Sequence, residues 1–88
     1  MTRSLYFLTI VLSLAAFAMP ARAEYVCRLN PNGDNFLSLR EGPGTDFNEI
    51  IRMGPNTILT VRSVRGQWLY VQTQEGYIGW AFSAYVCR

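Results

Sequence analysis

Hydrophobic and polar residues alternate in short stretches over most of the chain, and clusters of turn-forming residues separate these stretches. The clearest case is residues 57–64, where Leu59 and Val61 alternate with Thr60 and Arg62. Alternation over about four to eight residues predicts a half-buried β-strand. Segments with strand character are residues 36–40, 49–53, 57–64, 67–73, 77–82 and 85–87. The pattern predicts an all-β fold, a small, partly open barrel of five to six short antiparallel strands.

Glycine, proline and asparagine residues mark the boundaries between these expected strands. They gather at residues 30–35, 41–46, 54–56 and 74–76, and such residue types favour turns for known conformational reasons. We expect Arg65-Gly66 to make a tight turn between two strands and Ser83-Ala84 to form a corner before the last strand.

The first 23 residues differ in kind from the rest of the chain. A positively charged start with Arg3 precedes an apolar run from Leu5 to Met19, and the segment ends in a small-x-small pattern at Ala21-Arg22-Ala23. This is the layout of a secretory signal peptide cleaved after Ala23. The alternative is a retained membrane anchor, although a spanning helix needs about 20 apolar residues. We therefore expect residues 24–88 to form a periplasmic or secreted domain that is free of the membrane after cleavage.

The charge balance excludes two classes of partner once this segment is set aside. The chain has eight basic residues, all arginine, six acids and no histidine, which gives a net charge of +2. Arg3 and Arg22 lie in the expected signal peptide and none of the acids does, so six arginines face six acids. A nucleic-acid binder or a polybasic membrane binder needs a surplus of positive charge. We expect neither nucleic acid nor membrane as a partner.

Cys27 and Cys87 stand near the two ends of the expected domain. In an oxidising compartment an even number of cysteines indicates disulfides, and two cysteines allow only one intramolecular pairing. The alternative, a redox-active pair, would favour a Cys-x-x-Cys spacing or a nearby cation. We expect a structural disulfide that places the first and last strands side by side.

Four motifs built on glycine lie between residues 36 and 86. Residues 37–47 read LSLREGPGTDF, and the later motifs are Gly-x-x-Thr at 54–57, Gly-x-Trp-x-x-Val at 66–71 and Gly-x-x-Gly-Trp-x-x-x-x-Tyr at 76–85. In this order they resemble the motifs of bacterial SH3-like (SH3b) domains. The resemblance implies an SH3-like barrel over residues 24–88, with its core motif at 36–86.

Arg40, Gly42, Pro43 and Gly44 are interpreted as structural residues of a turn. A Gly-Pro-Gly sequence suits a type II turn, in which proline presets φ and Gly44 supplies a positive φ. Gly42 would relieve crowding where the chain leaves its strand. Arg40 can donate hydrogen bonds to loop carbonyls, so we interpret it as a scaffold residue rather than a ligand contact. Gly79 fits a strand glycine against which a neighbouring ring packs.

Nine aromatic residues follow residue 23, more than a core of this size can bury. In residues 67–73, alternation places Leu69 and Val71 on one face and Trp68 and Tyr70 on the other. If the aliphatic pair faces the core, the aromatic pair forms a half-exposed strip suited to extended peptides or glycans. The alternatives are rings that cover the barrel ends or pack against the loop at residues 30–35 and, for Trp80, a place in the core. The candidate ligand-binding residues are Trp68, Tyr70, Tyr77 and Trp80.

Catalysis and metal binding are not expected from this sequence. A serine hydrolase would lack its base without histidine or lysine, and the scattered acids show no calcium-loop spacing. We expect no metal and no cofactor. The resemblance instead implies a non-catalytic binding module that recognises cell-wall peptidoglycan or an extended peptide. The alternative is a small periplasmic protein–protein interaction factor, such as a subunit, an inhibitor or an envelope-stress component.

Overall fold

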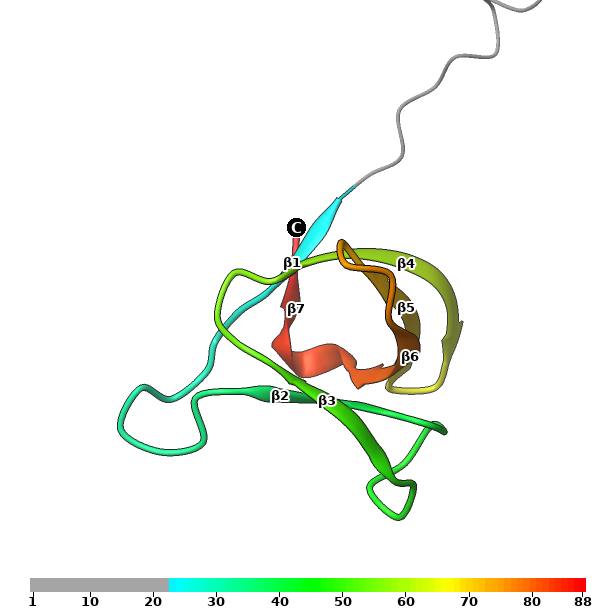
Figure 1. Cartoon of the computed structure of the whole chain (residues 1–88), viewed down its shortest axis with the longest axis horizontal. Coiled ribbons are helices and arrows are strands. Elements are labelled where there is room, and N and C mark those ends of the chain that lie inside the picture. Colours follow the sequence, from blue (N-terminus) through cyan, green and yellow to red (C-terminus); the bar gives the residue numbers. More distant parts are fainter. Residues whose placement is uncertain (1–22) are drawn as a thin grey trace, which may run out of the picture.

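A computed structural model describes residues 23–88, so the expected signal peptide lies outside the described residues except for Ala23. The described part has seven strands and one 3₁₀ turn (Figure 1). The elements are β1 (Glu24–Val26), β2 (Leu37–Arg40), β3 (Glu49–Met53), β4 (Ile58–Arg65), β5 (Trp68–Thr73), β6 (Ile78–Phe82), η1 (Ser83–Tyr85) and β7 (Val86–Cys87). Over this range, no helix is long and apolar enough to cross a membrane.

The all-β expectation is confirmed, with one strand more than expected. The additional strand is β1, whose three residues are too few to show an alternation pattern. It forms because it pairs with β4 on one side and β7 on the other. The corner expected at Ser83-Ala84 is the 3₁₀ turn η1.

All seven strands belong to one antiparallel sheet with the order β3-β2-β6-β5-β4-β1-β7. The sheet curls around the core, and β1 and β7 lie side by side at the end of the domain where the chain stops (Figure 1). Strands β3 and β7 stand at the two ends of the order and do not pair with each other. The barrel is therefore partly open, as the sequence predicts.

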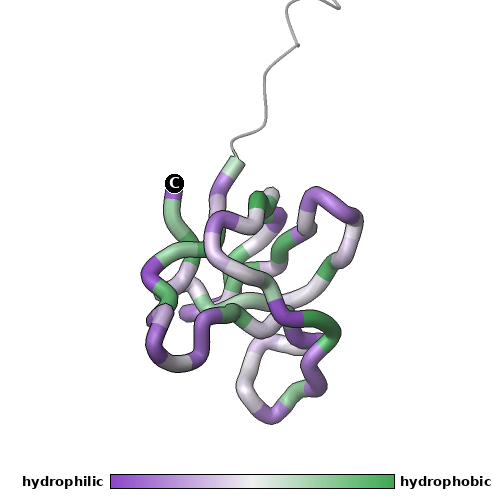
Figure 2. Tube along the Cα trace, turned by 60° about the vertical axis from the view of Figure 1, so that its left-hand side comes forward, coloured by the Kyte–Doolittle hydropathy of each residue, from purple (hydrophilic) through white to green (hydrophobic). Residues whose placement is uncertain are grey.

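The core lies inside the curled sheet and takes its side chains from six strands. Its buried members are Val26, Leu37, Leu39, Met53, Leu59, Val71 and Ala81. Most of these residues alternate with outward-facing ones because successive side chains of a strand point to opposite faces. Figure 2 accordingly shows apolar residues as short stretches between hydrophilic ones. So small a core leaves much of the aromatic surface outside it.

The two cysteines form a disulfide that joins the ends of the domain, with the Cα atoms of Cys27 and Cys87 5.8 Å apart. The surrounding backbone is paired as well, since Tyr25 lies opposite Cys87 in the sheet. In addition, the Cys27 amide donates to the Tyr85 carbonyl over 3.0 Å. The first and last strands thus lie side by side, as expected.

The Gly-Pro-Gly turn differs from the type II turn that we expected. Among the described residues, Gly66 and Gly76 are the glycines with positive φ, and Gly44 is not. The Gly44 amide instead donates to the Gly42 carbonyl over 2.9 Å. This bond closes a three-residue γ-turn on Pro43, and the fixed φ of proline suits the inverse form of that turn.

The tight turn after β4 is confirmed, although its loop is Gly66-Gln67, one residue further along than expected. Arg65 and Trp68 face each other across the β4–β5 hairpin, so the loop between them has two residues. Gly66 takes the first loop position with φ of 59°, which is the conformation that favours glycine in a two-residue hairpin.

Gly79 is required by a close approach, but the neighbour is not the aromatic ring that we expected. A Cβ atom on Gly79 would lie 2.7 Å from the Arg40 carbonyl oxygen and 2.9 Å from side-chain atoms of Leu39 and Ile50. The reason is that β2 crosses β6 at this point, where Arg40 pairs with Trp80. Gly79 therefore lets two strands meet closely rather than making room for a ring.

Candidate functional site

Four aromatic side chains share the outward face of β5 and β6. Trp68 lies opposite Phe82 and Tyr70 lies opposite Trp80 in the antiparallel register, and directly opposed residues project to the same face. The ring centroids are 5.4 Å apart in the first pair and 5.0 Å apart in the second. Val71 points inward and is fully buried, whereas the four rings are half-buried. The structure thus has the half-exposed aromatic strip that the alternation of residues 67–73 suggests.

The four candidate ligand-binding residues do not all lie together. Trp80 is outside the buried core and pairs with Tyr70, so the core position considered for it is wrong. Tyr77 is 48% exposed and borders a separate depression next to Ile51 and Thr57. The strip therefore contains three of the candidates and leaves Tyr77 elsewhere on the surface.

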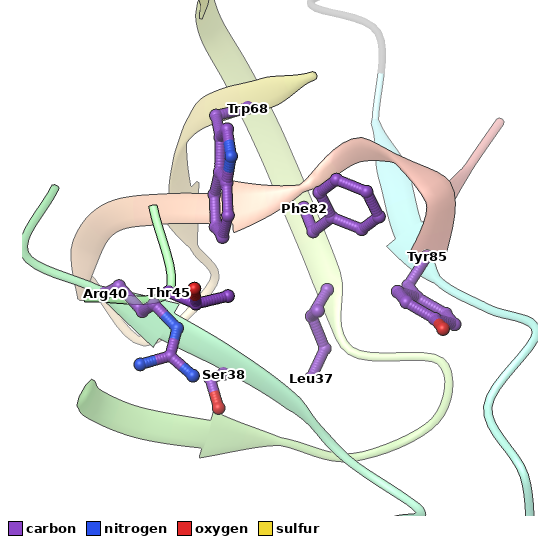
Figure 3. Close-up of a pocket in the computed structure, with 7 residues that line it drawn as sticks. All are labelled: Leu37, Ser38, Arg40, Thr45, Trp68, Phe82 and Tyr85. Carbon is purple, nitrogen blue, oxygen red and sulfur yellow. The ribbon is translucent and has the colours of Figure 1, made fainter. Parts of the chain in front are cut away.

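A groove of about 240 Å³ opens at one end of the aromatic strip (Figure 3). Its cause is that β2 pairs with β6 only where Arg40 meets Trp80. Toward Leu37 the two strands separate, and η1 carries Tyr85 to the far end of the gap. The residues that line the groove are Leu37, Ser38, Arg40, Thr45, Trp68, Phe82 and Tyr85.

Aromatic rings form one wall of the groove. The Phe82 ring lies between the other two, with its centroid 5.4 Å from that of Trp68 and 6.2 Å from that of Tyr85. The three rings are tilted rather than stacked on one another, an arrangement that aromatic pairs favour. In Figure 3 these rings stand across the gap from the side chains of β2. The wall offers an apolar surface with the polar atoms of Trp68 and Tyr85 at its edges.

The opposite wall combines the apolar Leu37 with polar side chains, of which Ser38 and Arg40 already have partners within the domain. The Ser38 hydroxyl donates to Glu49 Oε1 over 2.6 Å, and Arg40 Nη1 donates to the Phe47 carbonyl over 2.9 Å. The hydrogen bond from Ser38, followed by that from Arg52, lowers the pKa of Glu49 below its ordinary value of 4.5. Arg40 thus makes the bond to a loop carbonyl that its interpretation as a scaffold residue requires, while it also borders the groove.

A second cavity of about 390 Å³ continues the groove toward residues 28–36. The two cavities share Leu37, Ser38 and Tyr85. The added lining is more polar and comprises Arg28, Leu29, Asn30, Asp34 and Phe36. Together the cavities form a trough that is apolar at the tryptophan end and mixed at the other. We call the first cavity the groove and the second its polar extension.

Several groove residues were not predicted from the sequence. Phe82 follows Trp80 by two positions, so the strand period alone could have placed it on the same face. Tyr85 lies in the 3₁₀ turn, and Leu37, Ser38 and Thr45 belong to segments far from the aromatic strand in sequence. No local pattern connects those residues with Trp68.

Within residues 23–88, no three cysteine or carboxylate side chains are grouped to hold a metal ion.

Comparison with known proteins agrees with this architecture. The sequence model of one family, the bacterial SH3 domain, matches residues 35–86. No curated protein matches the chain closely enough to be counted as a relative. The matched range includes β2 to β6 and every residue that lines the groove, but not β1 or Cys27.

Proposed function

Because the chain belongs to the bacterial SH3 domain family, we propose that it is an exported, non-catalytic module that binds cell-wall peptidoglycan in its groove. Domains of this family are generally binding modules, often for cell-wall material or proteins. The observation that carries the proposal is the apolar groove between β2 and η1, with Trp68, Phe82 and Tyr85 on one wall. The groove adjoins its polar extension, so the two together suit a linear ligand.

The chemistry of the trough fits a ligand that joins sugar and peptide units. Aromatic walls accept extended chains and the apolar faces of rings, and a few polar groups orient what they hold. The polar extension supplies such groups at Asn30 and Asp34. Peptidoglycan combines sugar rings with short peptides, so each half of the trough has a matching part of the ligand.

Export is supported by the disulfide as well as by the expected signal peptide. Disulfides persist in oxidising compartments such as the periplasm and the extracellular space, and Cys27 and Cys87 are bonded. A cell-wall ligand is found in the same compartments. We therefore place the protein in the periplasm or outside the cell.

Sedimentation with purified sacculi tests this proposal. The wild-type protein, isolated after export, should sediment with the sacculi at low salt, and Trp68→Ala should weaken binding about tenfold or more, because central tryptophans dominate many interfaces. Tyr77→Ala is the matched control, since Tyr77 is an exposed aromatic residue away from the groove. Circular dichroism would verify that both variants fold. A wild-type protein that stays in the supernatant would contradict the proposal.

One observation favours a second function, the binding of an envelope protein. Large apolar side chains are exposed outside the groove, among them Val64 at 65% and Ile78 at 43%, and exposed apolar surface is typical of protein interfaces. Cross-linking in cells followed by mass spectrometry would separate the two functions. A single dominant protein adduct that persists in Trp68→Ala would support the protein partner.

A further inference from the structure

Two arginines flank the aromatic pair that lies outside the groove. Arg65 places its guanidinium carbon 5.6 Å from the centroid of the Trp80 ring. Arg62 Nε donates to Gln72 Oε1 over 2.9 Å. Gln72 follows Tyr70 by two positions in β5, so both side chains project from the same face of the strand. We call the set formed by Arg62, Arg65, Tyr70, Gln72 and Trp80 the platform.

The platform has a positive charge that the neutral net charge of residues 24–88 conceals. Both arginines are exposed, and within residues 23–88 neither takes part in a salt bridge, since the ion pairs there are Arg52–Glu49 and Arg88–Glu24. Three of the acids, Glu41, Asp46 and Glu49, lie instead in and beside the loop between β2 and β3. The arginines of β4 thus retain charge for an external anion.

The geometry leaves donors available on both guanidinium groups. Contact with the face of Trp80 holds Arg65 through its charge and uses none of its N–H groups. Gln72 orients Arg62 from one side and cannot satisfy all five of its donors. A guanidinium held in this way can still bind a carboxylate with two parallel hydrogen bonds.

We propose that the platform binds an anionic polysaccharide, with a sugar ring against Tyr70 and Trp80 and the carboxylate of that sugar on Arg65 and Arg62. The two rings are 5.0 Å apart and tilted by 46°, so together they present a shallow apolar surface beside the charges. This site is separate from the groove, which contains none of the five platform residues. It does not depend on peptidoglycan being the groove ligand.

A single-stranded nucleic acid also combines rings with negative charge, but the structure favours the glycan. Nucleic-acid affinity comes largely from neutralising many phosphates, and the platform offers two arginines. The disulfide between Cys27 and Cys87 also fits an oxidising compartment, outside the cytosol that holds the nucleic acids of the cell.

Titration with polygalacturonate, followed by tryptophan fluorescence and calorimetry, tests the site. We expect binding that weakens as salt rises, because the Debye length falls from about 10 Å at 0.1 M to about 3 Å at 1 M. Arg65→Ala should weaken binding about fivefold, as expected for one partly screened charge pair. Arg52→Ala removes the same charge from the salt bridge on β3 and should leave binding unchanged.

Two further arms separate this site from its alternatives. Fully methyl-esterified polygalacturonate has the same rings without the charge, and it should bind at least about fivefold more weakly. Tyr85→Ala alters the groove and should keep polygalacturonate binding, whether or not sacculus binding is lost. The proposal would be overturned if the esterified polymer bound as tightly as polygalacturonate, or if Arg52→Ala weakened binding as much as Arg65→Ala. Tighter binding of oligothymidylate of matched length than of polygalacturonate would overturn it as well.

Discussion

Removal of the disulfide is the perturbation whose consequences follow most directly from the structure. The double variant Cys27→Ser/Cys87→Ser keeps the size of both side chains and removes only the covalent link. The bond joins residues that are 60 positions apart, so nearly the whole domain lies in the closed loop. Without the bond, β7 has only two residues with which to hold its place beside β1.

The magnitude follows from the length of that loop. In the chain-entropy description, closing a loop of about 60 residues stabilises the folded state by about 4 kcal/mol at 25 °C. Domains of this size often have only about 5 kcal/mol of unfolding free energy, and this one has a small buried core. We therefore expect the double variant to retain roughly 1 kcal/mol.

The structure also connects the bond with the groove. The Cys27 amide donates to the Tyr85 carbonyl over 3.0 Å, and Arg28 Nη1 donates to the Ala84 carbonyl over 2.8 Å. Both bonds hold η1 against the chain next to Cys27. If β7 separates from β1, Tyr85 loses its position in the groove wall, so ligand binding should fall together with stability.

Urea unfolding, followed by tryptophan fluorescence at 25 °C, measures this effect. The double variant should unfold at a much lower urea concentration than the oxidised wild type. Wild-type protein reduced with a dithiol is the control for the serine side chains, and it should behave like the variant. An unfolding free energy within about 1 kcal/mol of the wild-type value would refute the loop-entropy reasoning.

Two other predictions follow from single contacts. Gly79→Ala should lower the unfolding free energy by about 1–3 kcal/mol, because the added methyl group would meet the Arg40 carbonyl oxygen at 2.7 Å. Gly54→Ala is the control, since a Cβ atom there has no neighbour within 4 Å. Equal losses of unfolding free energy in the two variants, measured by urea unfolding, would contradict the argument. The hydrogen bonds from Ser38 and Arg52 lower the pKa of Glu49, so their stabilising effect is present above the ordinary pKa of 4.5 and is lost as the pH falls through the lower folded-state pKa. Glu49→Gln should therefore be less stable than wild type at pH 7, with a difference that shrinks toward pH 3, whereas a difference independent of pH would show that the lowered pKa contributes nothing.

Much of the fold could be predicted from the sequence because it depends on local patterns. Short apolar or alternating segments between turn-forming residues located β2 to β6, and Gly66 marked the hairpin between β4 and β5. The family motifs identified the bacterial SH3 domain that the comparison shows. Cys27 and Cys87 could be paired because two cysteines leave no other intramolecular choice. The type II turn predicted at Gly42-Pro43-Gly44 is wrong, since several turn types suit that sequence and the packing around it selects one.

Less of the candidate site could be predicted from the sequence. Tyr77 and Trp80 are three residues apart and lie on different parts of the surface, because Tyr77 precedes β6 and Trp80 lies within it. Tyr85 reaches the groove through a 3₁₀ turn. The separation of charge between the platform and the β2–β3 loop is also invisible in a net charge.

The sequence by itself determined the positions of the strands from β2 to β7 and of the turns between them, and that the ends of the domain are linked. These properties depend on neighbours in the chain or on the small number of cysteines. Only the tertiary structure decided that β2 meets β6 at a single pair, Arg40 and Trp80, and then leaves it. That departure opens the groove, and it depends on how a short sheet curls around a small core, which no local pattern of residues specifies.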